Sequence, residues 1–146
     1  MGLVLQVKWG VFMIGLVVVS HGQLAREFLA AMEHVVGQQP NTCSICIGAD
    51  DDMDQRRNDI AEAVRATDQG EGVLILTDMF GGTPSNLALS LLDKDKVEVL
   101  AGVNLPMLIK VAEARQYASL GEVAAQGLDA GARYIALGSA ITNAQS

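Results

Sequence analysis

The amino-acid sequence predicts a single α/β domain with three layers, in which helices cover both faces of a mainly parallel β-sheet. Two features of the sequence lead to this prediction. Short apolar runs rich in Val, Ile and Leu, such as Ile14–Val19 and Gly72–Thr77, contain no charge and are typical of strands buried on both faces. Longer segments with helical spacing of apolar residues separate these runs, and this alternation favours parallel strands joined by right-handed crossovers. A chain of 146 residues is long enough to bury a substantial core.

We expect the domain to cover residues 13–140, preceded by an extension at Met1–Phe12 and followed by a polar tail at Ile141–Ser146. Lys8 and the apolar run Trp9–Val19 imitate the start of a secretory signal peptide. No convincing cleavage site follows this run, and it is too short to span a bilayer. Cleavage after the run Trp9–Val19 would also remove the first strand. We therefore interpret this run as the end of the extension followed by the start of the domain, not as a signal peptide.

The first half of the domain is expected to contain three strands and two helices. In order, these are the strand Ile14–Val19, the helix Gln23–Val36, the strand Cys43–Ile47, the helix Asp51–Thr67 and the strand Gly72–Thr77. Gly37 is placed to end the first helix, and the spacing of apolar residues predicts one apolar face on it. That face contains Leu24, Phe28, Ala31, Met32, Val35 and Val36. The second helix begins within an acidic run made of Asp50, Asp51, Asp52 and Asp54. Carboxylates favour the positive end of a helix dipole, and no histidine or second carboxylate cluster completes a metal site here.

The second half is expected to contain the remaining helices and strands. In order, these are the helix Thr83–Leu92, the strand Val97–Ala101, the helix Pro106–Tyr117, the helix Ser119–Gly131 and a short fifth strand at Ala132–Gly138. Thr83 is a good N-cap, and Pro84 suits the first helical position. Ser119 with Glu122 three residues later has the pattern of a capping box. We expect the strand order 2-1-3-4, with the fifth strand at an edge of the sheet.

Composition excludes several classes of function. The formal net charge is -7 and no cluster of Lys and Arg is present, which argues against nucleic acid as a partner. Cys43 and Cys46 form a CxxC pattern, but a redox pair needs its first thiol at a helix N-terminus. Both cysteines lie in a predicted strand, where residues three apart point to opposite faces, so we interpret them as structural. A sequence without a disulfide framework fits a cytoplasmic protein.

The candidate site combines His21 and Asp78, which follow the first and third predicted strands. The order 2-1-3-4 makes these strands neighbours, so both residues lie at the switch point where ligands bind in such sheets. An aspartate beside one ring nitrogen of a histidine fixes the tautomer and leaves the other nitrogen free as a nucleophile. The turn formed by Gly81, Gly82 and Thr83 precedes a predicted helix and offers backbone N–H groups to an anion. Together these features predict phosphoryl transfer onto the imidazole and off again, with no metal or cofactor.

Three stretches of the sequence carry a resemblance to a known family: VVVSHG with His21, GVLILTDMFGGTPSN with Asp78, and VEVLAGVNLPML. From Met13 to about Ala140, the chain resembles the enzyme IIA component of the mannose/fructose-type, phosphoenolpyruvate-dependent sugar phosphotransferase system. The resemblance implies that His21 accepts a phosphoryl group from the phosphorylated histidine phosphocarrier protein and that Asp78 orients the imidazole. It implies that the turn Gly82-Thr83 holds the phosphoryl oxygens. It also implies a homodimer in which the strand near Ala132–Gly138 is exchanged between subunits.

The chain differs from this family in its N-terminal extension and in lacking a fused IIB domain, so we expect a separate IIB component as the acceptor. Peripheral association with a membrane transporter is a further expectation. Two related alternatives use the same histidine: a regulatory phosphoacceptor without sugar transport, and the phosphocarrier subunit of a dihydroxyacetone kinase. A flavodoxin-like nucleotide-binding module is disfavoured, because the first strand ends in Ser20-His21-Gly22 without the loop that a phosphate tail needs. His34, inside the first helix and far from the anion cradle, is interpreted as a surface residue.

Overall fold

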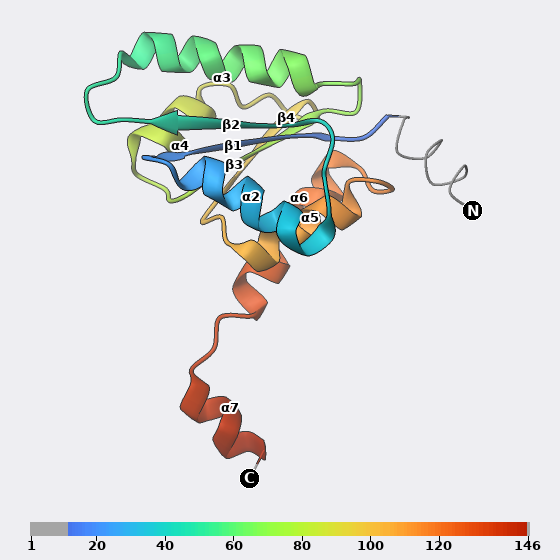
Figure 1. Cartoon of the computed structure of the whole chain (residues 1–146). Coiled ribbons are helices and arrows are strands. Elements are labelled where there is room, and N and C mark those ends of the chain that lie inside the picture. The colour runs from blue at the N-terminus through green and yellow to red at the C-terminus, as the bar shows by residue number, and fades with distance from the viewer. Residues whose placement is uncertain (1–11, 146) are drawn as a thin grey trace.

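The computed structural model describes residues 12–145 and contains a four-stranded parallel sheet in the order β2-β1-β3-β4 (Figure 1). The strands are β1 (Gly15–His21), β2 (Thr42–Ile47), β3 (Val73–Thr77) and β4 (Val97–Ala101). Both central strands are buried along their whole length except at His21, whereas most residues of the two edge strands are half-buried. The predicted strand order is confirmed, and it places the end of β1 beside the end of β3.

Six helices are present among residues 12–145. They are α2 (Leu24–Val36), α3 (Met53–Thr67), α4 (Thr83–Leu89), α5 (Leu105–Ala114), α6 (Leu120–Arg133) and α7 (Gly138–Gln145). Helices α2, α5 and α6 cover one face of the sheet, and α3 and α4 cover the other (Figure 1). The alternating side chains of β1 divide the core in the same way, since Leu16 and Val18 pack toward α2, α5 and α6, and Val17 and Val19 toward α3 and α4. The predicted three-layer architecture is therefore confirmed.

At the amino ends of the strands, the buried Arg115 ties three segments of the chain together. Its guanidinium donates to the carbonyl oxygens of Ile14 at 3.1 Å, Asn41 at 3.3 Å and Pro40, and to Oε1 of Gln39 at 3.2 Å. Burial lowers the pKa of Arg115 to about 10, so the side chain remains charged at neutral pH. These bonds hold the starts of β1 and β2 together at the end of the sheet opposite the candidate site.

Polar side chains cap the starts of α6 and α3 within two residues of the predicted starts. α6 begins with the predicted capping box, in which Ser119 and Glu122 each bond the other's backbone N–H. α3 begins after Asp52, whose carboxylate accepts the N–H groups of Asp54 and Gln55. The acidic run therefore serves the start of this helix, as the sequence indicates.

Of the predicted helices, α4 and α5 differ most from their expected bounds. The helix expected at Thr83–Leu92 ends at Leu89, and its N-cap is Gly82 rather than a threonine. Gly82 has the extended backbone that an N-cap requires (φ -101°, ψ 170°), whereas the next residue is already helical. The helix expected at Pro106–Tyr117 begins one residue earlier, after its Asn104 cap, and ends at the residue before Arg115.

The predicted apolar face of α2 is partly wrong. Leu24 and Val35 are exposed, while Ala25, outside the predicted face, is fully buried together with Met32. Helical spacing shows which residues share a face, but the rotation of the helix on the sheet depends on its neighbours.

The fifth strand predicted at Ala132–Gly138 is wrong for the single chain. α6 continues to Arg133, residues 134–137 have no regular structure, and α7 occupies most of the predicted polar tail. Figure 1 shows α7 extending away from the rest of the domain. A strand needs a second strand beside it for its backbone hydrogen bonds, and none of the described strands pairs with this segment, whereas a helix forms its bonds locally. We refer to residues 134–145 as the C-terminal arm.

The predicted extension Met1–Phe12 lies outside the described residues except for Phe12, which is exposed. Over residues 12–145, the structure contains no helix with the length and apolar character needed to cross a membrane.

Candidate functional site

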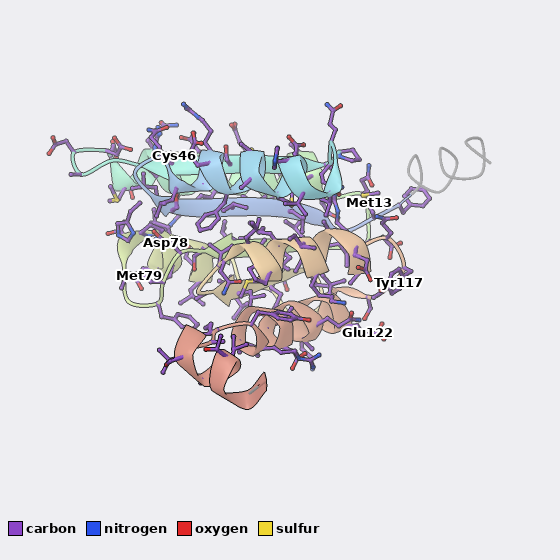
Figure 2. All side chains as sticks on the ribbon, turned by 60° about the horizontal axis from the view of Figure 1, so that its bottom comes forward. Met13, Cys46, Asp78, Met79, Tyr117 and Glu122 are labelled. Atoms are coloured by element: carbon purple, nitrogen blue, oxygen red, sulfur yellow. The ribbon has the colours of Figure 1, made fainter. Side chains whose placement is uncertain are left out.

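The candidate site lies at the carboxyl edge of the sheet, where β1 and β3 end side by side. His21 is the last residue of β1, and Asp78 directly follows β3. Figure 2 shows Asp78 and Met79 at one end of the domain and Met13 at the opposite end. The parallel topology thus brings together two residues that are far apart in the sequence, at the edge where open α/β sheets bind ligands.

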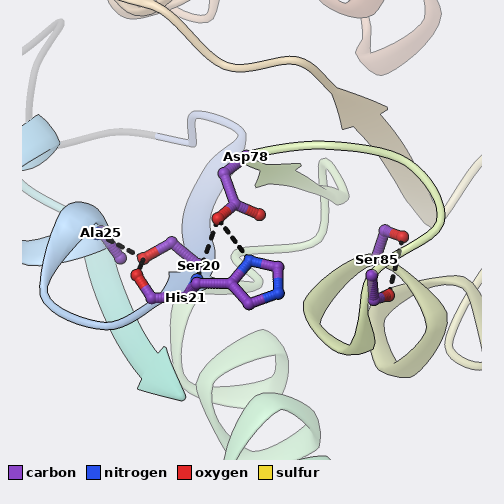
Figure 3. A network of polar contacts seen from close by, with 6 residues as sticks. Ser20, His21, Ala25, Asp78 and Ser85 are labelled. Atoms are coloured by element: carbon purple, nitrogen blue, oxygen red, sulfur yellow. Dashed lines mark hydrogen bonds and ion pairs between the residues drawn. The ribbon is translucent and has the colours of Figure 1, made fainter. Parts of the chain in front are cut away.

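A single carboxylate oxygen holds His21 at two points. Oδ2 of Asp78 accepts the backbone N–H of His21 at 2.9 Å and lies 2.8 Å from its ring Nδ1 (Figure 3). An ionised carboxylate can only accept hydrogen bonds, so Nδ1 carries the ring proton and Nε2 keeps its lone pair. The His21 side chain is 50% exposed and that of Asp78 is 11% exposed, so the imidazole is accessible while the carboxylate is mostly covered.

The environment of Asp78 keeps its carboxylate ionised. Burial acts to raise the pKa of Asp78, but the hydrogen bonds from the His21 backbone and ring, together with the electrostatic interaction with that ring, lower it below its usual value. The second oxygen, Oδ1, is buried and has no hydrogen-bond partner among the described residues. All of the described hydrogen bonds to this carboxylate therefore involve His21, through Oδ2.

The opposite side of the imidazole faces Gly82. A Cβ atom at this position would lie 2.7 Å from Cε1 and 3.1 Å from Nε2 of His21, so any side chain here would displace the ring or the backbone. The Nε2 edge of the ring thus lies against the backbone that starts α4. Ser85, a buried residue in the first turn, donates its hydroxyl to the carbonyl oxygen of Gly82 at 3.1 Å and fixes this segment (Figure 3).

The start of α4 also offers hydrogen-bond donors beside the ring. The first N–H groups of a helix have no partner within it, and Pro84 has none to satisfy. Gly81 before them adopts a φ of 86°, which glycine tolerates without strain. Thr83 is exposed and lines the same hollow as His21. That hollow is formed by His21, Gly22, Ile47, Gly48, Ala49, Met53 and Thr83.

The structure brings together the predicted residues at this edge and separates the others. His34 is exposed on α2 and is not among the residues that surround the hollow. Cys43 and Cys46 are free and half-buried, and they pack against opposite faces of the sheet as predicted. Sequence reasoning missed Ser20 and the contact between Gly82 and the ring, because neither a serine beside a histidine nor a Gly-Gly pair indicates what it touches.

The arrangement is suited to nucleophilic chemistry at Nε2 of His21. Its proton is fixed on the other nitrogen, its lone pair is accessible, and a carboxylate lies where it can stabilise positive charge on the ring. Thr83, the first residue of α4, lines the same hollow as His21, and the start of a helix is a place where N–H groups can bind an anion.

Comparisons with known proteins agree on one family. The family model described as the PTS system fructose IIA component (EIIA-man) matches residues 15–127. The mannose-specific EIIAB component of Escherichia coli strain K12 is 34% identical over 103 residues, which cover 70% of this chain and 32% of that protein, so the chain spans about a third of that relative. The sorbose-specific EIIA component of Lacticaseibacillus casei is 34% identical over 98 residues, covering 66% of this chain and 70% of the relative. The crystal structure of the phosphotransferase system component EIIA from Streptococcus agalactiae superimposes with a TM-score of 0.79 at 27% identity, covering 88% of this chain and 99% of that one.

Proposed function

Since this chain belongs to the mannose/fructose-type family of phosphotransferase-system IIA components, we propose that it carries a phosphoryl group on Nε2 of His21. The donor is the phosphorylated histidine phosphocarrier protein, and the acceptor is a separate IIB component that serves sugar uptake. The observation that supports this role is the 2.8 Å contact between Nδ1 of His21 and Oδ2 of Asp78, which leaves the nitrogen opposite it free to react.

Transfer needs no proton movement at the reacting nitrogen. The lone pair of Nε2 forms a bond to phosphorus while the bond between phosphorus and the donor's imidazole nitrogen breaks, and the electron pair of that bond returns to the donor. The His21 ring, still protonated at Nδ1, then carries positive charge next to the Asp78 carboxylate. The same bonds break and form in reverse when the IIB component accepts the group.

The turn before α4 would hold the transferred group. Gly82 allows the backbone to approach the ring, Gly81 adopts the positive φ of the turn before it, and the hydroxyl of Thr83 adds a donor in the same hollow. Hydrogen bonds to the three equatorial oxygens stabilise the charge that spreads over them during transfer. No metal or cofactor takes part in this proposal.

The central experiment reconstitutes the chain with phosphoenolpyruvate, enzyme I and the phosphocarrier protein, using labelled phosphate. We expect one label per chain on His21, lost in acid and stable in base, as a phosphoramidate is. His21→Ala should remove labelling without unfolding, because the side chain is half exposed and leaves no core cavity. His34→Ala is the matched control and should label normally. Full labelling of His21→Ala, or a label that survives acid, would contradict the proposal.

Addition of a IIB component separates transport from regulation. Transfer of the label to a IIB protein, and from there to a sugar, supports a transport role. A label that stays on this chain with every IIB protein offered would instead support the regulatory phosphoacceptor. Labelling by a dihydroxyacetone kinase relay, rather than a sugar-specific one, would identify the third alternative.

A further inference from the structure

Ser20 belongs to the polar network around His21, although the proposed transfer does not use it. It is the last buried residue of β1, and none of its surface is exposed. Its hydroxyl accepts the backbone N–H of Ala25 at 2.6 Å and donates to the carbonyl oxygen of His21 at 3.1 Å (Figure 3). One side chain therefore joins the end of the strand to the catalytic residue and to the first turn of α2.

This hydroxyl replaces a missing helix cap. Gln23, at the N-cap position of α2, makes no side-chain hydrogen bond to the helix. The N–H of Ala25 is buried, so without Ser20 it would have no partner, which is costly in an apolar interior. On the other side of the turn, Gly22 has a φ of 53° and donates its N–H to the carbonyl oxygen of Ile47 at 2.8 Å. Ser20 thus links the turn after β1 to α2, and Gly22 links it to β2.

The position of this turn determines whether the imidazole can reach its carboxylate. The backbone N–H and the ring Nδ1 of His21 bond the same oxygen of Asp78, so both the backbone and the side chain must be oriented correctly at once. Ser20 bonds the carbonyl group of that same residue. We propose that Ser20 is a positioning residue for phosphoryl transfer, whose hydroxyl fixes the backbone of His21 so that Nδ1 stays on Asp78 and Nε2 faces Gly82. This inference rests on the proposed role of His21.

The chemistry of the hydroxyl makes the proposal specific. It must accept one hydrogen bond and donate another in the same place, which alanine cannot do and threonine can. We expect Ser20→Ala to let the imidazole populate both neutral tautomers and to slow phosphoryl acceptance about tenfold, the effect of losing one buried hydrogen-bond partner. Ser20→Thr should restore both the tautomer and the rate.

The tautomer is measured from the ¹⁵N chemical shifts of the imidazole in the unphosphorylated protein. The sequence contains two histidines, so the exposed His34 gives an internal reference in the same spectrum. Thr67→Val is the matched control, since it removes another buried hydroxyl bond, from Thr67 to the carbonyl oxygen of Ala63 at 2.8 Å, near the opposite end of β1. It should lower Tm without shifting the His21 signals or the transfer rate.

The proposal is overturned if Ser20→Ala lowers Tm as Thr67→Val does but keeps the wild-type imidazole signals and transfer rate, because Ser20 would then be only a structural residue. If Ser20→Ala does not fold, Ser20→Cys keeps the side-chain size with a weak donor and acceptor, and the same two measurements decide. The imidazole signals need no phosphoryl donor. A wild-type chain that cannot be labelled, combined with shifted signals in Ser20→Ala, would therefore refute the proposed function and leave the positioning of the ring established.

Discussion

Asp78→Asn tests the charge of the carboxylate with little change in its shape. If the amide oxygen takes the place of Oδ2, it can still accept from His21, but the amide nitrogen then occupies the buried place of Oδ1, which has no partner in the described structure. If the amide is turned the other way, its NH₂ group faces the two N–H donors of His21. Both orientations weaken the hold on the ring.

The size of the effect follows from the two contacts. A hydrogen bond to a charged group contributes about 1.5–3 kcal/mol and a neutral one about 0.5–1.5 kcal/mol. The midpoints of these ranges differ by about 1.3 kcal/mol, so the loss of charge at one contact slows the reaction about tenfold. When Nε2 bonds to phosphorus the ring becomes cationic, and a unit charge about 4 Å from a carboxylate near a protein surface is stabilised by about 4 kcal/mol. Because the His21 side chain is 50% exposed, solvent screens part of this term. We expect phosphoryl acceptance to slow by between about tenfold and about a thousandfold.

Rapid-quench, single-turnover transfer from the labelled phosphocarrier protein measures this rate directly. His34→Gln, which changes the other histidine on the exposed surface of α2, provides the control for nonspecific effects. Circular dichroism and thermal unfolding check that Asp78→Asn is folded. A transfer rate within a factor of about two of wild type would show that Asp78 has only a structural role, and the tautomer argument for Nε2 would fail with it.

Three further predictions concern Gly82 beside the imidazole, the stability of the protein in acid and the C-terminal arm. Gly82→Ala puts a Cβ 2.7 Å from Cε1 of His21, so it should cost about 1–3 kcal/mol in urea unfolding and slow transfer at least about tenfold, whereas Gly121→Ala, in open space, should do neither. The folded pKa of Asp78 is lowered, so its contribution to stability is full above the unfolded pKa of about 3.9 and is lost as the pH falls through the folded pKa. The difference in free energy of unfolding between wild type and Asp78→Asn, measured by urea titration, should therefore decrease as the pH falls from about 5 to about 2. A difference that stays constant over this range would show that the pKa of Asp78 is not lowered by folding. Deletion of Arg133–Ser146 should cause aggregation or a smaller species in light scattering, and a soluble species of unchanged size would show that the arm does not hold an assembly.

The contact between His21 and Asp78 was predictable because both residues lie at the ends of strands that can be recognised from composition alone. The apolar runs before His21 and Asp78 locate the strands, and the parallel topology then brings their ends to the same edge. The strand ends therefore define the site more reliably than the type of residue found there. His34 has the same chemistry as His21, but it is exposed on α2 and makes no described hydrogen bond or ion pair with a carboxylate, whereas His21 contacts Asp78.

The parts of the site that escaped prediction depend on rotations and contacts rather than on spacing. Sequence periodicity gave α2 an apolar face that contains Leu24, yet in the structure Ala25 is the buried residue and its N–H is bound by Ser20. Similarly, the pair of glycines before α4 indicates a permissive backbone, but it does not show that Gly82 lies against the reactive edge of the imidazole. The contact of Gly82 with His21 joins two segments distant in the sequence, and the bond between Ser20 and Ala25 depends on the conformation of the turn between β1 and α2. The spacing of apolar residues encodes neither.

The C-terminal arm shows how a local preference for strand can remain unsatisfied in one chain. Its first residues are apolar, and Tyr134, Ile135 and Leu137 are all exposed. β4 pairs with β3 on one side. On its outer side, the described contacts are an isolated bridge between Asp93 and Val97 and a hydrogen bond from the N–H of Val99 to the Glu98 carboxylate at 2.9 Å. If the Glu98 side chain moves aside, this edge of β4 can pair with another strand. A second copy of the chain would offer such an edge to each arm and bury the exposed apolar residues, so the predicted strand and the predicted homodimer require each other. Because the net charge of -7 on each chain opposes association, added salt should tighten a dimer of this kind.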